Sequence, residues 1–558
     1  MQKSLLSLLL PCLLAATCIA ALVFWAGTGP LPQLHARTPG LDKAPAARPA
    51  TIAQRPVQGE PVYGPGRPSS LAGAWPFFRG AEHDAICTEK IPLNREWPKG
   101  GPEKLWTVEL GDGYAAAAID AGRVFVLDHV HDAPIDQLRA LSPADRDTLA
   151  AALASLPPDK LDSLETTLRR LFPAKGSDPN DPQRGISEQE FMAVIEALGK
   201  LLADNREQLI NALRHDSLDD VDRSADTLRC LSLDDGREIW RNGYPVIVPW
   251  SHGRSRTIPA AAGKYVMTIG PQCQAACWDA ETGKGLWLID MVLDYGATVP
   301  PWYTGQCPLV DEKTDRVILA PGGRALMIAV DYKTGKVIWE SPNPHNWAMT
   351  HVSIVPIEFA GRKMYVYCGK SGVAGVAAES GEILWETTDW QIGAATCPSP
   401  VAVGDGKIFF SGGYNAGSLM LQLTENNGKF EAKTLFRLTA KQFSSEQQTP
   451  VLYDGRLYGV RQQDKELVCL DLGGKEVWNS GRDKFGSAPY MIADGMIFVM
   501  NDDGLLVTAE ASPAGYKPIA RAQVIDNGYE SWGPMAMAAG RLIVRDMTRM
   551  VCLRVSEK

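Results

Sequence analysis

Five segments of this chain share one short phrase, in which a polar turn containing glycine is followed by three residues and then tryptophan. The phrase ends at Trp240, Trp287, Trp339, Trp385 and Trp478. Successive tryptophans are 47, 52, 46 and 93 residues apart, and the last step is close to twice the others. A fixed period of this size is typical of repeat proteins, whose repeats stack to bury a continuous core. The period therefore constrains the fold more than any other feature of the chain.

Residues 263–287 show what one period contains. Tyr265, Met267 and Ile269 alternate as in a strand, residues 275–278 begin a second strand, and a turn at Gly283 leads into a third. A further strand comes first, usually after a Cys-Pro or Thr-Pro pair. Four short antiparallel strands per period predict the blade of a β-propeller, with the tryptophan packed between neighbouring blades.

Two segments lack the tryptophan but keep the strand pattern. In the 93-residue step, Phe436 stands near the expected position, and residues 486–525 give a further blade. The last repeat, around Cys552, has three strands, whereas Trp106 lies in an isolated strand near the start. We expect the Trp106 strand to dock beside Cys552 and close the ring. The predicted fold class is all-β, an eight-bladed propeller, with seven blades as the alternative if residues 486–525 form no full blade.

The N-terminal residues are distinguished by their hydropathy. An apolar run from Leu5 to Ala26 has about the length that spans a bilayer and is longer than the core of a secretion signal. We expect residues 1–26 to be an uncleaved signal anchor and the proline-rich residues 27–70 to be an extended tether. Cleavage after Ala36 and lipidation at Cys18 are the alternatives. The propeller is therefore expected outside the cytoplasmic membrane.

Charge excludes one class of partner. The net charge is −9, charged residues make up 22%, and no basic tract interrupts this balance. Nucleic acid is therefore not an expected partner.

Eleven cysteines in an exported chain would ordinarily suggest disulfides. Their positions in the repeat indicate otherwise, because one repeat position is occupied by Cys230, Cys277, Cys469 and Cys552. We expect these four thiols to be small buried groups between blades. Cys307 and Cys397, each followed by proline, are predicted to share a second repeat position. Equivalent positions of different blades are too far apart to bridge, so no disulfide framework is expected.

Residues 133–226 differ from the rest and interrupt blade one between its second and third strands. Their leucines recur at helical spacing, which predicts helical hairpins. Residues 178–191 resemble a calcium-binding loop, but only Asp181 stands where such a loop needs an acidic oxygen, and Arg184 replaces its glycine. A structural hairpin is the default, and no metal site is predicted. This insertion is a candidate partner surface, and residues 71–132 and 227–558 form the propeller.

The first strand of each blade lines the central channel, so polar and aromatic residues just before it are binding candidates. These candidates are Trp250, His252, Arg254, Arg256, Trp302, Gln306, His351, Gln448 and Trp532. Arg254 and Arg256 alternate along an expected strand and would face one side, where they could bind a carboxylate. The alternative is that such groups bind only water and one another.

Two further interpretations concern a metal site and the charges of the opening segment. His252 and His351 have no third ligand at a recognisable spacing, so no metal is assigned to them. Glu82, His83 and Asp84 are expected to be surface charges.

The repeat phrase resembles that of propellers of the pyrroloquinoline-quinone (PQQ) enzymes. The opening segment resembles the start of bacterial envelope proteins with PQQ-like repeats, relatives of the propeller lipoprotein of the outer-membrane assembly machine. Its motifs are Trp75-Pro76-Phe77-Phe78-Arg79-Gly80, Trp97-Pro98-Lys99-Gly100-Gly101-Pro102 and Leu105-Trp106. The resemblance covers about residues 75–132 and 227–556, and what it implies most directly is the fold.

The resemblance implies two contrasting functions. In the quinoprotein dehydrogenases, PQQ and calcium lie in the channel, an aspartate accepts a proton, and tryptophan and a vicinal disulfide hold the quinone. This chain has no adjacent cysteine pair, and the aspartate and calcium-ligand motifs are not recognisable. We therefore expect a non-catalytic binding or scaffold module in the periplasm, with envelope protein partners and no cofactor. A PQQ-dependent oxidoreductase is the alternative.

Overall fold

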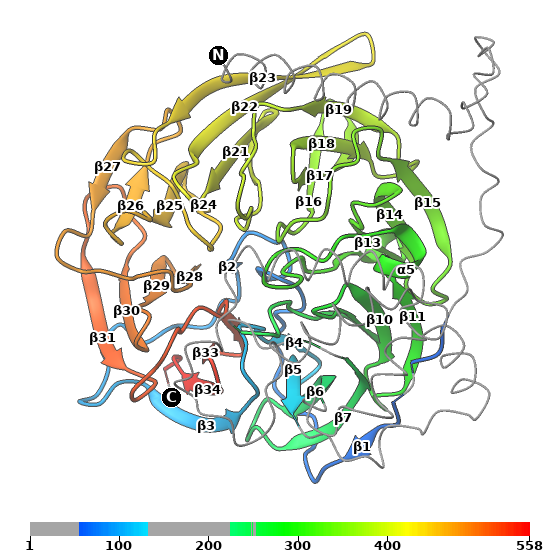
Figure 1. Ribbon diagram of the computed structural model, residues 1–558. Helices are drawn as coiled ribbons and strands as arrows, with labels where there is room; N and C mark the ends of the chain where they lie inside the picture. The colour runs from blue at the N-terminus through cyan, green and yellow to red at the C-terminus, as the bar shows by residue number, and fades with distance from the viewer. Residues whose placement is uncertain (1–54, 58, 132–223, 247, 249–252, 558) are drawn as a thin grey trace, which may run out of the picture. The chain divides into compact units, whose positions relative to one another are not determined.

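The computed structural model describes residues 55–57, 59–131, 224–246, 248 and 253–557 (Figure 1). The chain divides into two units, Met1–Ala53 and Gln54–Lys558. The expected anchor, the alternatives at Cys18 and Ala36, and the calcium-loop resemblance lie outside the described residues. No helix within those residues is long and apolar enough to cross a membrane.

The second unit is a ring of eight sheets, and in each the chain runs from an inner strand beside the axis to an outer strand at the rim (Figure 1). Inner strands contact those of neighbouring blades, and β32 (Ala536–Ala538) contacts β4 (Ala118–Asp120), which joins the last blade to the first. The predicted eight-bladed propeller is confirmed. Residues 486–525 contribute a complete blade, so the seven-bladed alternative is wrong.

Blades one to four follow one another along the chain. Blade one holds β4, β5 (Arg123–His131), β6 (Ser224–Ser232) and β7 (Glu238–Pro245). Blade two holds β8 (Ala260–Ala262), β9 (Tyr265–Ile269), β10 (Gln274–Asp279) and β11 (Gly285–Asp290), followed by helix α5 (Met291–Tyr295). Blade three holds β12 (Leu309–Asp311), the short helix η2 (Glu312–Thr314), β13 (Arg316–Leu319), β14 (Ala325–Asp331) and β15 (Val337–Pro342). Blade four holds β16 (Val355–Phe359), β17 (Arg362–Gly369), β18 (Gly372–Ala377) and β19 (Ile383–Thr387).

Blades five to eight complete the ring. Blade five holds β20 (Val401–Gly404), β21 (Lys407–Gly412), β22 (Gly417–Asn426) and β23 (Lys429–Leu438). Blade six holds β24 (Val451–Tyr453), β25 (Arg456–Val460), β26 (Leu467–Leu470) and β27 (Glu476–Asn479). Blade seven holds β28 (Tyr490–Ala493), β29 (Met496–Met500), β30 (Leu505–Glu510) and β31 (Pro518–Gln523). Blade eight holds β32, β33 (Arg541–Arg545), β34 (Arg549–Arg554) and, from the start of the chain, β3 (Glu103–Glu109).

The ring closes where the sequence predicts. β3 pairs antiparallel with β34, and Trp106 lies opposite Cys552. Cys230, Cys277 and Cys469 likewise lie opposite their tryptophans, and all four thiols are fully buried. The nine cysteines of the described residues are free. The interpretation of the four repeat cysteines as small buried groups is therefore confirmed.

The repeat tryptophans link neighbouring blades by hydrogen bonds as well as by packing. The indole Nε1 of Trp106, Trp240, Trp287, Trp339 and Trp478 each donates to a backbone carbonyl in the next blade, over 2.8–3.2 Å. Trp385 differs, because its Nε1 faces the Met364 sulfur of its own blade at 3.1 Å. All six rings are buried.

Two predicted boundaries differ from the structure. Residues 55–70, placed in the tether, include β1 (Val62–Tyr63), which pairs with β7, and Arg55, which bridges to Leu288. Residues 224–226, placed in the insertion, begin β6. In both cases backbone hydrogen bonds to neighbouring strands extend the fold beyond the apolar pattern.

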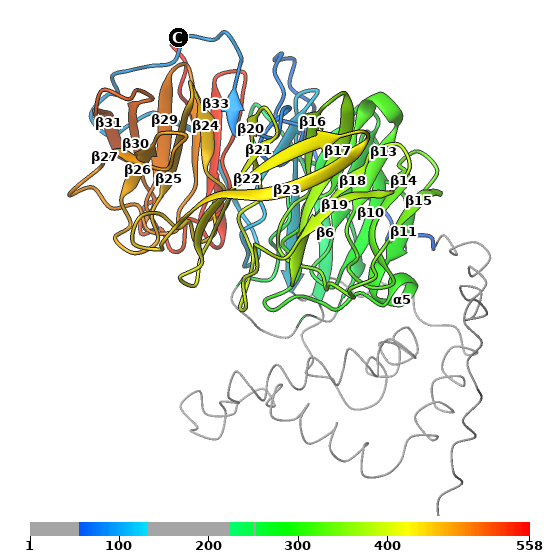
Figure 2. The same ribbon diagram turned by 90° about the horizontal axis from the view of Figure 1, so that it is seen from above.

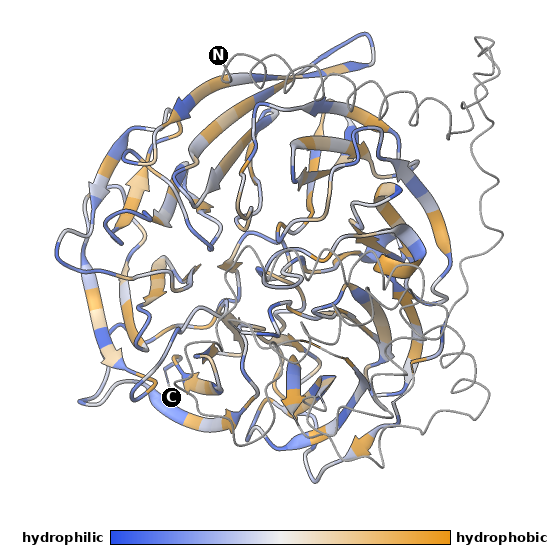
Figure 3. Cartoon of the chain, viewed as in Figure 1, coloured by the Kyte–Doolittle hydropathy of each residue, from blue (hydrophilic) through white to orange (hydrophobic). Residues whose placement is uncertain are grey.

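The ring has two faces. The turns between the first and second strands of the blades, such as Asp494-Gly495, lie on one face, here called the turn face. The segments that lead into the inner strands lie on the other, together with α5, and this is called the loop face (Figure 2). Strands within the blades are largely hydrophobic, whereas outer strands alternate between hydrophobic and polar residues (Figure 3). Apolar faces of adjacent blades therefore make the core, as expected for packed sheets.

Candidate functional site

The predicted binding residues that the structure describes lie on the loop face, in segments leading into inner strands. Trp250 and His252 lie outside the described residues. Residues 254–256 do not form the expected strand, since only Ser255 makes an isolated bridge, to Gly113. The reason is that this segment bonds to residues 112–115, which lead into blade one, instead of joining blade two. Arg254 is 2% exposed and pairs with Asp112, with Nη1 3.2 Å from Oδ1.

Arg256 lies among aromatic residues contributed by several blades. Its guanidinium is 5.0 Å from the centre of the Tyr114 ring, a cation–π contact. Tyr114 stacks on Trp532 with ring centres 5.2 Å apart, and its hydroxyl donates to Glu530. Burial lowers the pKa of Arg256, while burial and the Glu530 carboxylate raise the pKa of Tyr114. This opening of the channel on the loop face, here called the mouth, thus combines a half-buried cation, stacked rings and a carboxylate.

A second part of the mouth is formed by blades three, four and five. His351 Nε2 lies 2.7 Å from the carbonyl oxygen of Pro301. Burial, and then the charge of Arg256, lower the pKa of His351 to about 4, so this ring is neutral at pH 7. The ring of Trp302 stacks on Tyr414, with centres 6.5 Å apart and planes within 6°. This stack joins the loop before blade three to a hairpin of blade five.

Backbone strain is concentrated at the same stack. Trp302, Tyr303 and Tyr414 have φ angles of 59°, 72° and 55°. The left-handed region costs a residue with a side chain about 1–2 kcal/mol. Such conformations persist where surrounding contacts impose them and often occur at functional sites.

Two predicted residues have structural partners. Gln306 is fully buried, and its amide exchanges hydrogen bonds with the backbone of Ala320 over 2.9 and 3.2 Å. Gln448 Nε2 donates to the Trp532 carbonyl at 2.9 Å, and Trp532 Nε1 donates to Asp502 at 2.8 Å. The contacts of both glutamines match the alternative interpretation, in which the channel groups bind one another.

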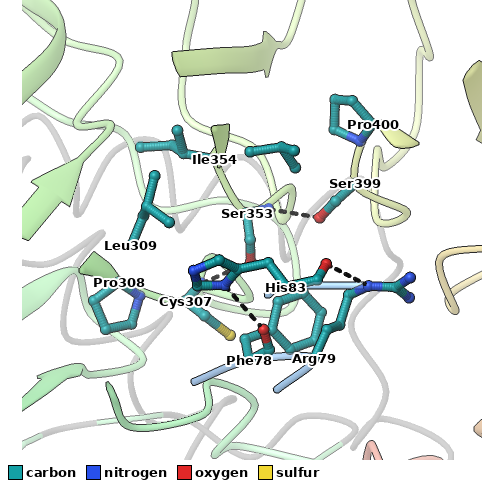
Figure 4. Close-up of a pocket in the computed structure, with 11 residues that line it drawn as sticks. Phe78, Arg79, His83, Cys307, Pro308, Leu309, Ser353, Ile354, Ser399 and Pro400 are labelled. Atoms are coloured by element: carbon teal, nitrogen blue, oxygen red, sulfur yellow. Dashed lines mark hydrogen bonds between the residues drawn. The ribbon is translucent and has the colours of Figure 1, made fainter. Parts of the chain in front are cut away.

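The opening segment lies inside the channel, which corrects the assignment of His83 and Asp84 as surface charges. His83 is half-buried, stacks on Phe77 at 5.3 Å, and has its pKa lowered to about 4 by burial. Asp84 is half-buried and accepts from the Ile86 amide at 2.9 Å. The same segment brings Phe78 and Arg79 beside the blades (Figure 4). Glu82 is exposed, as expected.

Figure 4 shows a cavity of about 10 Å³ between this segment and blades three, four and five. A volume of this size holds about one water molecule. A hollow of about 510 Å³ lies beside β2 (Ile86–Cys87), and its walls include Tyr453 and Ile492. Neither cavity is lined by a residue that the sequence analysis selected for binding.

Side chains before the inner strands form a hydrogen-bonded belt through blades two to six. Each member's side chain accepts from a backbone amide of the preceding blade over 2.9–3.2 Å, and the members are Cys307, Ser353, Ser399 and Thr449. The residue equivalent to Cys307 is therefore Ser399, two residues before its strand. The predicted equivalence of Cys307 and Cys397 is wrong, because two successive proline pairs, at Pro398 and Pro400, offered the same local signal.

The described channel residues do not fit a calcium-bound quinone. Calcium takes six to eight oxygen ligands, several of them carboxylates. The described part of the chain has no group of three His, Cys, Asp or Glu residues placed to hold a metal. Glu530 accepts the Tyr114 hydroxyl, and Asp502 accepts from Trp532 and from the Ser487 amide. These carboxylates serve internal contacts.

Several residues of the site were not selected from the sequence, among them Tyr114, Asp502 and Arg79. Tyr114 stands just before the inner strand of blade one, so the rule used for the other blades would have found it. Asp502 lies in a turn with no distinctive signal. Arg79 belongs to the opening motif, which the sequence analysis used only for the family resemblance.

Comparison with known proteins defines the class of this propeller. A family model described as outer membrane protein assembly factor BamB matches residues 224–480, from β6 in blade one to the end of blade six. This match and the eight four-stranded blades fit a PQQ-like β-propeller. No curated protein matches it.

Three solved structures illustrate the likeness in fold. BamB from Moraxella catarrhalis is 13% identical, with a TM-score of 0.41 over 59% of this chain and 93% of that one. The computationally designed Ika8 protein is 10% identical, with a TM-score of 0.39 over 59% and 93%. A europium-containing methanol dehydrogenase is 10% identical, with a TM-score of 0.39 over 86% and 90%.

Proposed function

We propose that this protein is a membrane-tethered, extracytoplasmic propeller that acts as a non-catalytic binding or scaffold module for another protein of the bacterial envelope. The observation that carries the proposal is the way in which the insertion is attached to two paired strands of blade one. β5 and β6 pair in continuous register from Arg123↔Ser232 to His131↔Ser224. Both ends of the insertion therefore leave blade one side by side on the loop face. Segments inserted in this way on one face of a repeat ring commonly supply its binding surface.

Polar contacts hold together the strands that carry the insertion. Arg229 bridges Asp128 at 3.2 Å and Glu238 at 2.8 Å. On the same strands, the Tyr244 hydroxyl donates to the buried Asp226 at 2.8 Å. Charge-assisted bonds of this kind are stronger than neutral ones. These contacts support the role of the insertion as a surface that is fixed to the ring.

The family description gives independent support. The matching family model is described as an assembly factor of outer membrane proteins, which is a role exercised through other proteins. The apolar run at residues 5–26 and the proline-rich stretch after it support attachment to the cytoplasmic membrane. The channel carboxylates, which serve internal contacts, favour a binding module over a quinoprotein.

Replacing residues 132–223 with Asn-Gly tests the proposal. This dipeptide makes the tight turn that joins paired strands, and His131 and Ser224 are already opposite each other. Crosslinking in intact cells should recover an envelope protein with the full chain and not with the replacement. The purified pair should then bind with the insertion and bind at least tenfold more weakly without it. Equal thermal stability of the two propellers is the control.

Two results would count against the proposal. Recovery of the same partners with and without residues 132–223 would remove the insertion as the contact surface. Stoichiometric binding of PQQ with calcium, together with dye reduction by alcohols or sugars, would establish the oxidoreductase alternative instead.

A further inference from the structure

We propose that residues 75–94, here called the strap, thread the central channel, connect all eight blades and close the channel towards the turn face. Groups lining the channel would then be reached from the loop face, where the insertion is mounted. The strap would act in this way whether or not the propeller binds a protein partner.

The strap begins as an added edge on blades one and two. Trp75 exchanges two backbone hydrogen bonds of 2.8 Å with Ile119 in β4. The next residue, Pro76, accepts from the amide of Ala261 in β8 at 2.8 Å. Inner strands would otherwise turn these amides towards the channel, so the strap satisfies donors that the blades leave open.

The strap then lies against blades three, four and five. Phe78 packs on the core cluster that contains Cys307, which is 2% exposed. Ser353 of blade four and Ser399 of blade five face Phe78 and Arg79 across the cavity of about 10 Å³ (Figure 4). The fit leaves room for about one water molecule, so this contact is nearly closed.

Arg79 fixes the strap to blade six. Its guanidinium donates to the carbonyl oxygens of Thr449 at 2.8 Å and Pro450 at 3.0 Å. It also donates to the carbonyls of His83 at 3.2 Å and Asp84 at 2.9 Å, which folds the strap back on itself. A planar fork with five donors suits such a set of carbonyls, and an ammonium group does not.

The strap ends on blades seven and eight. β2 adds to β28 as a parallel strand, with the Ile492 amide donating to the Ala85 carbonyl at 2.9 Å. Glu89 accepts from the Ala539 amide at 2.7 Å, and the Asn94 amide donates to the Val555 carbonyl at 2.8 Å. Contacts therefore follow the blades in order around the axis as the chain advances. One continuous segment touches every blade.

Hydrogen exchange in the full chain tests whether the strap is bound. The amides of Ile119, Ala261 and Ile492 each donate to the strap, so they should be protected in the unaltered protein. In Arg79→Ala, loss of the guanidinium bonds should speed their exchange by about tenfold or more, while amides in β26 stay protected. Free exchange of the three amides in the unaltered protein would overturn the proposal without any variant.

Thiol labelling distinguishes an opened strap from an unfolded ring. Cys307 lies under Phe78, whereas Cys277 is buried between strands of blade two. With maleimide and peptide mass spectrometry, Arg79→Ala should label Cys307 at least tenfold faster and leave Cys277 protected. Arg95→Ala is the matched control, because this exposed arginine lies just beyond the strap and bonds to Asp494. Equal labelling of both thiols, or no change at Cys307, would contradict the strap.

Discussion

At the scale of single residues, the repeat phrase owes its form to a contact between blades. In four of the five phrases the turn glycine lies on the tryptophan of the preceding blade, whereas Gly474 lies on Phe436 of blade five. A Cβ atom at Gly335, for example, would come within 2.7 Å of the Trp287 ring, and Gly335 has φ of 71°. Space and backbone conformation both require glycine here. Glycine and tryptophan therefore recur together in the sequence, although the glycine of a phrase contacts the tryptophan of another blade.

Gly335→Ala should therefore destabilise the propeller through two effects. The left-handed conformation costs about 1–2 kcal/mol, and overpacking against Trp287 adds about 1–3 kcal/mol. Gly361→Ala is the matched control, because Gly361 has φ of 72° and no atom within 4 Å of an added Cβ. Urea unfolding should show a larger loss for Gly335→Ala. Equal losses would mean that the tryptophan contact does not constrain this position.

A buried carboxyl group at the base of the insertion should make stability depend on pH. Burial raises the pKa of Asp226 to about 7, against about 4 in an unfolded chain. Between these values the folded state keeps the proton that the unfolded state has lost, so stability falls as pH rises. Unfolding at pH 4.5 and 7.5 should show a fall of about 3 kcal/mol from this group.

Asp226→Asn should reduce this dependence, because the amide cannot ionise and can still accept from Tyr244. Asp454→Asn, at an exposed position, should leave the pH dependence unchanged. If all three proteins lose stability equally between the two pH values, Asp226 does not retain its proton in the fold.

At the scale of elements, the hairpin of blade five explains the one tryptophan that departs from the pattern. β22 and β23 are ten residues each, so their turn reaches beyond the position of the usual glycine turn. The Trp385 indole therefore faces the Met364 sulfur and lies beside Gly375, both in its own blade, and not a backbone carbonyl of the next blade. The sequence showed the missing tryptophan of blade five but not this effect on blade four.

Closure of the ring depends on β3, which comes from the opposite end of the chain. Trp106 lies opposite Cys552 and also donates to Leu233 in blade one at 3.0 Å, so it joins blades eight and one. Trp106→Ala should cost about 3–5 kcal/mol, as for other buried aromatic truncations, and should speed amide exchange in β34 first.

An exposed residue provides the comparison for this substitution. Leu435 is 50% exposed, and Leu435→Ala should change stability by less than about 0.5 kcal/mol. Similar losses for the two variants, or exchange that begins elsewhere in the ring, would mean that β3 does not hold the closure.

At the scale of the whole molecule, the two faces of the ring have different roles. The strap occupies the channel, while β5 and β6 end on the loop face, where the segments that hold Arg256 and Trp302 also lie. The sequence predicted the mouth because polar residues before inner strands recur at the repeat period. It did not predict the strap, because the partners of Arg79 are about 370 residues away in the chain.

The sequence alone predicted the closing strand and the burial of the repeat cysteines, and it favoured eight blades over seven. These properties follow from local alternation and a fixed period, which every blade repeats. Only the tertiary structure decided the place of the opening segment, the equivalence of Cys307 with Ser399, and the partners of Arg254 and Arg256. Those features depend on donors and acceptors that meet across the channel, and no local pattern records which blade lies opposite another.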